Sequence, residues 1–326
     1  MRNIVDKIYN LLDNKRNKYI TIASAFAVIA VLPLFMNNYV LTVSHNAMHY
    51  ILLALGLNII VGYCGMCDLG YAAKFAIGAY TTGILIRTLG WSFWLTLPAS
   101  VIVSVIIALI IGAPTLKLRS DYLAIVTLGF AEIVRITAQN LEITGRASGI
   151  HGITRPHFFG IHLTGATNWY YTLLVLIVIY VFISYRIRHS RFGRALAYIK
   201  EDEDAAQAMG VNTTSYKLCA YAIGAVLGGV AGSFFAVRMT SISPGSFDFT
   251  QSANIMLAVI LGGMGKIPGV MIGAVFFAVF PELFRFLPTI GGIRISDMRM
   301  LFFGLLLIIV MIKRPQGLWP ERRTKK

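Results

Sequence analysis

The sequence predicts an all-α protein, a polytopic bundle of helices that crosses a membrane about ten times (8–10 spans). Of the 326 residues, 57% are hydrophobic and only 13% are charged, whereas a typical soluble domain carries about 25% charged residues. A soluble fold would have to shield this apolar surface from water, but the outer side chains of a bundle in lipid face hydrocarbon. The third observation is the pattern: apolar stretches of roughly span length follow one another with short polar connections.

Each apolar stretch is predicted to form one membrane-spanning helix. The first follows a basic N-terminal segment. It is long for a signal sequence and other spans follow at once, so we predict that it remains as an uncleaved span. In chain order the stretches lie at about 19–36, 40–62, 69–89, 93–113, 121–140, 168–186, 217–237, 251–264, 267–288 and 299–313.

Two regions, 56–78 and 251–274, are rich in glycine and have the least certain helix boundaries. Glycine tolerates interruptions of a helix, and irregular backbone at membrane depth occurs where protein surrounds it. We therefore predict broken or re-entrant helices in these regions. If two stretches are re-entrant or fused with a neighbour, the number of spans falls to eight and both chain ends stay on the same side.

Basic residues set the predicted orientation. Most of the 29 Lys and Arg lie in alternate polar segments, which the positive-inside rule assigns to the cytoplasm. Both termini are then cytoplasmic. The predicted divisions are a cytoplasmic N-terminal segment 1–18, a transmembrane domain 19–313 with a cytoplasmic loop 187–216 and an external loop 141–167, and a cytoplasmic tail 314–326.

Several other functions are disfavoured. The net charge of +15 could suggest nucleic-acid binding, but no polar domain is long enough to present it, so we predict no nucleic-acid partner. Cys64 and Cys67 have the spacing of a redox or metal half-site, but no second pair accompanies them. His45 and His49 share a helical face without an acid or cysteine to complete a site. We predict no catalytic residue, no metal and no cofactor.

The loop 187–216 has the features of two short helices. Most residues from Arg191 to Gly210 are good helix formers, and Glu201 to Asp204 lie where the positive end of a second helix dipole would be. Gly210 is predicted to end that helix. Its alanines leave a narrow, smooth surface that could dock in a groove of a cytoplasmic partner. A solvated amphipathic linker explains the same pattern equally well.

The motif Asp204-Ala-Ala-Gln-Ala-Met-Gly210 resembles the EAA-type loop of ABC importer permeases, with Asp in place of the leading Glu. Further stretches are similar to the permeases of branched-chain amino acid importers, and the overall pattern is close to their LivM-type subunit. These stretches are Gly62 to Thr81, Leu116 to Ile133, Ser190 to Leu196, Leu261 to Gly265 and Lys313 to Pro320.

This resemblance implies a function, partners and a location. The chain would be the permease subunit of a binding-protein-dependent ABC importer for Leu, Ile and Val in a bacterial inner membrane. It would pair with a second, LivH-like permease, two ATP-binding subunits like LivG and LivF, and an extracytoplasmic amino-acid-binding protein; ATP hydrolysis would belong to the partner chains. The residues predicted to couple it to the ATPases are Arg194, Glu201, Glu203, Asp204, Ala205, Ala206 and Gly210.

The translocation path of such a permease needs apolar walls and a few polar groups or broken-helix ends. The candidate path residues are Asn58, Asp68, Tyr71, Thr127, Gly129 and Glu132. Lys74 stands where the resemblance leads us to expect an aromatic residue, and at this depth it must snorkel, face a wet cavity or pair with an acid. Asp68 is not on its helical face, but a broken helix could bring the two together.

Two other kinds of transporter fit parts of the pattern. A urea or short-amide ABC permease has a similar sequence. An ion-coupled secondary transporter would need titratable residues within its spans, and few are present. Glu132 and Arg135 lie three residues apart in one span, where they form either a functional site or a structural ion pair near the outer face.

Overall fold

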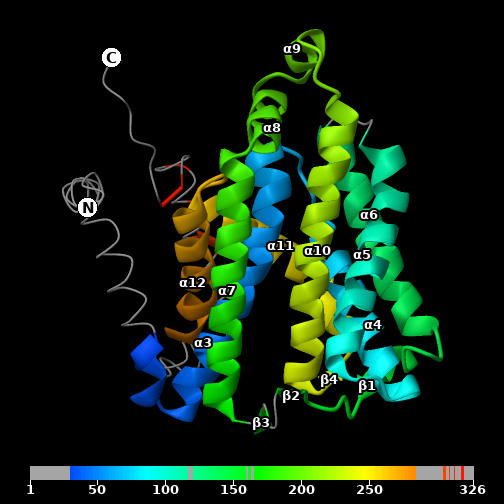
Figure 1. Ribbon diagram of the computed structural model, residues 1–326, viewed down its shortest axis with the longest axis vertical. Coiled ribbons are helices and arrows are strands. Elements are labelled where there is room, and N and C mark those ends of the chain that lie inside the picture. The colour runs from blue at the N-terminus through cyan, green and yellow to red at the C-terminus, as the bar shows by residue number, and fades with distance from the viewer. Residues whose placement is uncertain are drawn as a thin grey trace.

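The apolar stretches form the long helices of a bundle (Figure 1). The computed structural model describes residues 30–116, 120–158, 161–162, 165–283, 304–305, 308, 312 and 317–318. The long helices are α3 (Asn38–Asn58), α4 (Tyr71–Leu89), α5 (Phe93–Thr115), α6 (Ser120–Asn140), α7 (Ala166–His189), α10 (Thr213–Met239), α11 (Phe249–Gly262) and α12 (Ile267–Leu283). The predicted stretches from 40–62 to 251–264 are therefore largely helical, and the stretch 267–288 is helical as far as Leu283, where the described part of the chain is interrupted.

Two of the predicted spans lie wholly or mostly outside the described residues. The stretch 299–313 and most of 19–36 lie outside the described residues; the end of 19–36 forms the 3₁₀ turn η1 (Leu32–Leu34). Five of the described helices are long and apolar enough to cross a membrane. These are Asn38–Tyr63, Phe93–Thr115, Tyr122–Asn140, Ala166–His189 and Thr213–Met239.

Helix α3 forms the centre of the bundle. In the most apolar stretch of the span Asn38–Tyr63, which includes α3, 89% of the residues are buried inside the protein. In the corresponding stretches of α5, α6 and α7 the buried shares are 28%, 28% and 33%. The outer helices direct large aliphatic side chains such as Ile102, Ile133 and Val178 away from the protein. An apolar exterior around a packed interior is typical of an integral membrane protein, because lipid solvates the outer surface.

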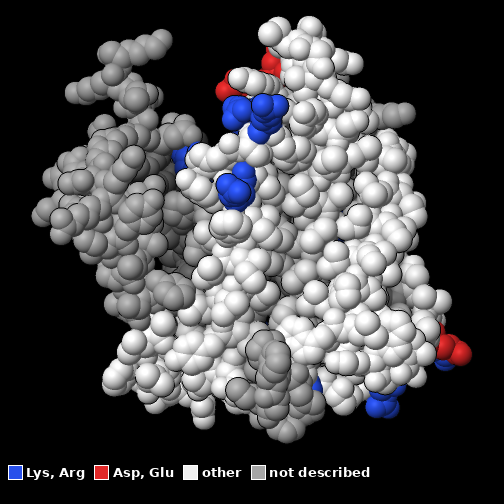
Figure 2. Space-filling view, in the orientation of Figure 1, with Lys and Arg blue, Asp and Glu red and all other residues white. Residues whose placement is uncertain are grey.

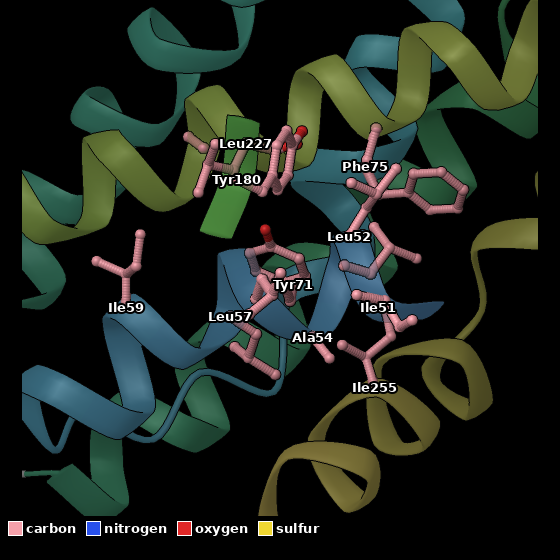
Figure 3. Packing of buried hydrophobic residues seen from close by; sticks show 14 of the residues in the cluster. Ile51, Leu52, Ala54, Leu57, Ile59, Tyr71, Phe75, Tyr180, Leu227 and Ile255 are labelled. Atoms are coloured by element: carbon pink, nitrogen blue, oxygen red, sulfur yellow. The ribbon is translucent and has the colours of Figure 1, made fainter. Parts of the chain in front are cut away.

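Buried side chains from five helices meet beside α3. Figure 3 shows Leu52 of α3 together with Phe75 of α4, Tyr180 of α7, Leu227 of α10 and Ile255 of α11. Each is less than 5% exposed. This contact region holds the inner helices together by van der Waals packing, the main source of helix association where lipid replaces water.

Helices α4 and α10 approach one another through glycine. A Cβ added at Gly78 would lie 2.2 Å from the carbonyl oxygen of Gly229, and one added at Gly232 would lie 2.2 Å from that of Phe75. Neither position has room for a side chain. The small residues therefore set the helix separation, as they do in many membrane proteins.

The predicted helix breaks are confirmed. After α3 the chain forms a π-helical stretch, η2 (Ile59–Tyr63), and then runs without helix to the start of α4. Most of this connection is buried, as irregular backbone at membrane depth must be. The second break is a tight turn between α11 and α12, where Gly263 and Gly265 have φ of 106° and 84°.

The two ends of the bundle differ. At one end, α8 (Arg191–Glu201) and α9 (Glu203–Ala208) extend beyond the long helices (Figure 1). At the other lie short strands and two 3₁₀ turns. They are β1 (Ile150–His151) paired antiparallel with β4 (Ser241–Ile242), β2 (His157–Phe158) paired with β3 (Ile161–His162), η3 (Arg146–Ser148) and η4 (Pro244–Phe247). Figure 2 shows charged side chains near both ends and a broad uncharged band between them.

Candidate functional site

The helices α8 and α9 begin at well-formed caps. The Ser190 hydroxyl accepts a hydrogen bond from the backbone N–H of Gly193 at 3.1 Å, and the Asp202 carboxylate accepts one from that of Ala205 at 3.0 Å. Such caps satisfy N–H groups that have no partner within the helix. Glu203 and Asp204 occupy the first turn of α9, where the helix dipole favours negative charge. The predicted start of a second helix in this acidic run is confirmed.

Gly210 ends α9, as predicted. Its φ of 85° lies in the left-handed region. The N–H of Val211 bonds to the carbonyl of Ala206 at 3.1 Å, and the N–H of Gly210 bonds to that of Gln207 at 2.9 Å. This pair of bonds is a Schellman motif, in which glycine avoids the strain that a Cβ would cause.

The surface of α9 faces away from the bundle. Of the residues predicted to contact an ATPase, only Ala206 is buried, and it packs inward. The others are exposed: Arg194, Glu201, Glu203, Asp204, Ala205 and Gly210. Met209 beside them is 85% exposed. The short helix thus presents a small, partly apolar surface at one end of the protein.

Two lysines connect this helical pair to the bundle. The Lys200 ammonium at the end of α8 donates to the carbonyl oxygen of Gly62 in η2 at 2.8 Å. Lys217 in α10 forms an ion pair with Glu203 in α9. A displacement of α8 and α9 would therefore act directly on the first helix break and on α10.

Asn58 joins the two helix breaks. Its side-chain oxygen accepts a hydrogen bond from the N–H of Gly265 at 2.8 Å. Asn58 is fully buried. The end of α3 and the turn after α11, far apart in sequence, are thus held side by side close to Lys200.

Asp68 and Lys74 are paired across the first break. One carboxylate oxygen of Asp68 accepts from the N–H of Gly70 at 3.0 Å, and the other forms an ion pair with the Lys74 ammonium. The ammonium also lies 3.6 Å from the centre of the Tyr221 ring, a cation–π distance. Of the alternatives for Lys74, the structure shows pairing with an acid.

The candidate path residues fall into two groups. Tyr71 donates to the carbonyl of Gly224 at 3.1 Å, and Thr127 accepts from the N–H of Leu69 at 3.2 Å. Together with Asn58 and Asp68, these residues form a buried polar cluster around the first break. Gly129 and Glu132 lie apart on α6.

Glu132 forms an ion pair with Arg135 on the same helix. The two side chains are 40% and 25% exposed. An ion pair of neighbouring helical residues fits the structural alternative for these charges.

The starts of α4 and α11 meet inside the bundle. The N–H of Ala72 in the first turn of α4 donates to the Ser252 hydroxyl of α11 at 3.0 Å. Asp248 caps α11 by accepting from the N–H of Gln251 at 2.9 Å. Two helix N-termini, each the positive end of a dipole, therefore converge within the protein.

A cavity of about 410 Å³ opens beside them, nearer the strand end. Its walls come mainly from α3, α10, α11 and α12. The lining residues are Asn46, His49, Tyr50, Phe75, Phe235, Arg238, Ser246, Gln251, Asn254, Phe277, Ala278, Pro281 and Glu282. None of the candidate path residues is among these described lining residues.

The sequence did contain a signal for this cavity. Gln251 and Asn254 are amide side chains one turn apart in the polar first half of α11. Arg238 follows the predicted span 217–237 directly, so the predicted topology places it in an outer connection. In the structure it lies in the last turn of α10. Only the tertiary structure shows that these side chains border one space.

The sequence is similar to those of known transport proteins. The family model described as the permease component of the branched-chain amino acid transport system matches residues 39–311. The chain belongs to this family. It is 39% identical to the high-affinity branched-chain amino acid transport system permease protein LivM of Salmonella typhimurium strain LT2, over 92% of this chain and 75% of the relative.

Two further relatives extend the comparison. LivM of Escherichia coli strain K12 is 37% identical over 92% of this chain and 75% of its own length. The permease protein LivH of Salmonella typhimurium is 26% identical over 85% of this chain and 93% of its own length. No solved structure matches the chain.

Membership of the family settles the class of protein. The chain is a multi-pass integral membrane protein and a permease subunit of an ABC importer. The alternative of an ion-coupled secondary transporter does not fit this family. The breaks at the ends of α3 and α11, the exposed helix α9 and the polar cavity are therefore features of a permease.

Proposed function

We propose that this permease carries Leu, Ile and Val across the bacterial inner membrane, with ATP hydrolysed by partner subunits. The observation that supports coupling most directly is α9, a capped and exposed helix tied through Lys200 and Lys217 to the bundle. The relatives named above transport branched-chain amino acids, which supports the choice of substrate.

The proposed orientation places α8 and α9 in the cytoplasm and the short strands outside. The transmembrane domain 19–313 then has about ten spans, with a cytoplasmic loop 187–216 and an external loop 141–167. The segments 1–18 and 314–326 are both cytoplasmic. The charge distribution along the sequence supports this arrangement.

The proposed assembly has four kinds of partner. This permease pairs with a second, LivH-like permease, a choice supported by the similarity between this chain and LivH. Each permease contacts one of two cytoplasmic ATP-binding subunits like LivG and LivF. A soluble binding protein delivers the amino acid from the outer side.

In the proposed cycle, the ATPases close on ATP and pull on α9. The coupling residues are Arg194, Glu201, Glu203, Asp204, Ala205, Ala206 and Gly210. Movement of α8 displaces Gly62 through Lys200, which changes the packing at the two helix breaks. The buried cluster of Asn58, Asp68, Tyr71 and Thr127 borders this moving region, and Gly129 and Glu132 lie farther along the proposed path.

A substitution at Ala205 tests the docking role of α9. Ala205 is exposed, so Ala205→Glu leaves the fold intact but places an unpaired charge in the proposed interface. Such a charge costs on the order of 2–5 kcal/mol when a partner buries it, enough to reduce uptake by at least about tenfold. The measurement is uptake of labelled leucine at matched amounts of membrane-inserted protein.

The matched control is Ala147→Glu, which makes the same change at an exposed alanine of η3 at the opposite end. We expect wild-type uptake from this control. Gly210→Pro, which removes the N–H of the Schellman motif, should abolish uptake as Ala205→Glu does. Normal uptake by Ala205→Glu would rule out the docking role.

The substrate is tested with the purified complex in proteoliposomes. ATP hydrolysis stimulated by the binding protein is measured with branched-chain amino acids, other amino acids, urea and short amides. We expect the strongest stimulation with Leu, Ile or Val. Stimulation by urea or amides alone would favour the alternative urea and short-amide permease. Uptake that is abolished by an uncoupler while ATP remains available would contradict ATP-driven transport.

A further inference from the structure

The cavity between α3, α10, α11 and α12 has the features of a ligand site. Its volume of about 410 Å³ lies within the range of small-molecule sites, about 300–1,000 Å³. Such sites combine apolar walls with a few polar groups that fix the orientation of the ligand. The lining of this cavity contains both apolar side chains and polar groups.

Two cavity-lining residues carry buried nitrogen atoms that have no hydrogen-bond partner in the described part of the chain. They are both ring nitrogens of His49 and the Nε of Arg238. The Arg238 guanidinium donates through another nitrogen to Asn46 at 3.1 Å. Buried polar groups almost always have partners, and an unpaired one indicates a water, an ion or a ligand that completes the site.

Among the residues that the structure describes, Arg238 also has no carboxylate partner. Within the described residues, the ion pairs join Lys74 to Asp68, Arg135 to Glu132, Arg146 to Glu142 and Lys217 to Glu203. None includes Arg238. A mostly buried guanidinium in a membrane helix is costly without a negative partner, and its planar set of donors matches a carboxylate.

Aromatic rings form the apolar wall next to these nitrogens. Phe75 and Phe235 lie 5.0 Å apart between ring centres, and His49 lies 5.3 Å from Phe75 and 5.1 Å from Phe235. Tyr50 and Phe277 form a second ring pair at 5.4 Å. Such a wall accommodates an aliphatic side chain without offering it hydrogen bonds.

Oxygen atoms are present along another part of the lining. The Glu282 carboxylate accepts a hydrogen bond from the Tyr39 hydroxyl at 2.6 Å. Tyr50 donates to the side-chain oxygen of Gln251 at 3.2 Å. These oxygens can accept hydrogen bonds from an ammonium group. Cationic, anionic and aromatic groups therefore border one space.

We propose that this cavity binds the transported amino acid within this subunit. Arg238 and His49 hold the α-carboxylate, Glu282 and Gln251 face the α-ammonium, and Phe75 and Phe235 contact the aliphatic side chain. The site rests on the proposed function, because it assigns that substrate to a place. It explains why the ring nitrogens of His49 and the Nε of Arg238 have no hydrogen-bond partner among the described residues.

The first test uses wild-type protein. The complex is purified through this subunit, placed in lipid nanodiscs without the binding protein, and studied by saturation-transfer NMR. We expect saturation of the leucine methyl groups, because they lie against aromatic rings. Leucinamide, which lacks the carboxylate, should bind more weakly by about tenfold or more. Equal binding of leucine and leucinamide would overturn the proposal.

The second test changes the site. Arg238→Gln should weaken leucine binding by about tenfold or more, and Arg238→Lys by less, because it keeps the charge. His49→Phe preserves a ring among Phe75 and Phe235 and removes both nitrogens, so it should also weaken binding. The control is Arg87→Gln, at an exposed arginine of α4 outside the cavity lining, which should bind as the wild type does.

The outcomes of these experiments distinguish an error in the proposed site from an error in the proposed function. Uptake of leucine by wild-type proteoliposomes supplied with ATP and binding protein tests the function. If uptake occurs but Arg238→Gln and His49→Phe both bind leucine as Arg87→Gln does, the site is wrong and the function stands. If wild-type proteoliposomes import no branched-chain amino acid, the function itself is wrong.

Discussion

Asp68 and Lys74 show how a single ion pair can hold a broken helix. Their side chains are 0% and 4% exposed, so both charges have lost their water. Desolvation can exceed the attraction within a buried pair, unless further contacts satisfy the remaining groups. Here the N–H of Gly70 and the ring of Tyr221 supply those contacts. The pair therefore stabilises the start of α4 inside the bundle.

Removing one charge of this pair should destabilise the protein more than removing both charges. Lys74→Met leaves the Asp68 carboxylate buried and unpaired, which should lower the free energy of unfolding by about 3–5 kcal/mol. In the double variant Asp68→Asn with Lys74→Met, no uncompensated charge remains, and much of the stability should return. Thermal unfolding of the purified complex in one detergent measures both. A single variant as stable as the wild type would exclude a structural role for the pair.

Part of this interaction could be predicted from the sequence. Lys74 stood out because a charged side chain at membrane depth needs a partner, and Asp68 was the nearest acid in the sequence. Their pairing depended on the break between η2 and α4, because six residues of continuous helix would have separated them. The cation–π contact with Tyr221 of α10 has no signal in the local sequence.

Among the secondary-structure elements, the pair of helices α8 and α9 is linked by a hydrogen bond to the π-helical stretch η2. The Lys200 ammonium bonds to the carbonyl of Gly62 within η2. A π-helix is a local distortion that is often found at functional sites. Gly62 also lies against the second break, since a Cβ there would be 2.5 Å from the backbone nitrogen of Gly265. Motion of α8 can therefore reach both breaks through these direct contacts.

Loss of the Lys200 hydrogen bond should uncouple ATP hydrolysis from transport. A bond from a charged donor contributes about 1.5–3 kcal/mol, so Lys200→Met should reduce stimulation of ATP hydrolysis by the loaded binding protein by about tenfold or more. Basal hydrolysis and the amount of assembled complex should remain close to wild type. Arg191→Met, at an exposed arginine of the same helix, is the matched control. Full stimulation in Lys200→Met would show that this contact does not transmit the movement.

For the whole molecule, the difference between its two ends defines how it lies in the membrane. The α8–α9 end and the strand end are separated by an apolar, outward-facing surface on α5, α6 and α7. Lysine and arginine predict that the α8–α9 end is cytoplasmic. The cavity then lies nearer the outer side, and the proposed ATPase-docking helix lies on the inner side.

Cysteine labelling tests this orientation. The native Cys64, Cys67 and Cys219 are first replaced, and single cysteines are placed at the exposed positions Ala147 and Ala205. A membrane-impermeant maleimide should label position 147 in intact spheroplasts and position 205 only in inverted vesicles. Labelling of position 205 in spheroplasts would reverse the proposed orientation.

The amino-acid sequence alone predicts the membrane environment, most of the described helices and the approximate start and end of α9, and it identifies the family. These properties depend on composition, on the length of apolar stretches and on neighbouring residues, so they can be read locally. Gly210 is an example, because its role as the end of α9 depends only on the preceding turn.

Which distant residues share a site depends on the tertiary fold. Asn58 meets Gly265, Lys200 meets Gly62, and His49 and Arg238 border one cavity, although each pair is far apart in the chain. In lipid, an apolar stretch predicts a span but does not predict which of its faces turns inward, because lipid and protein are similarly apolar. Packing between helices, through small residues such as Gly78 and Gly229, made that choice.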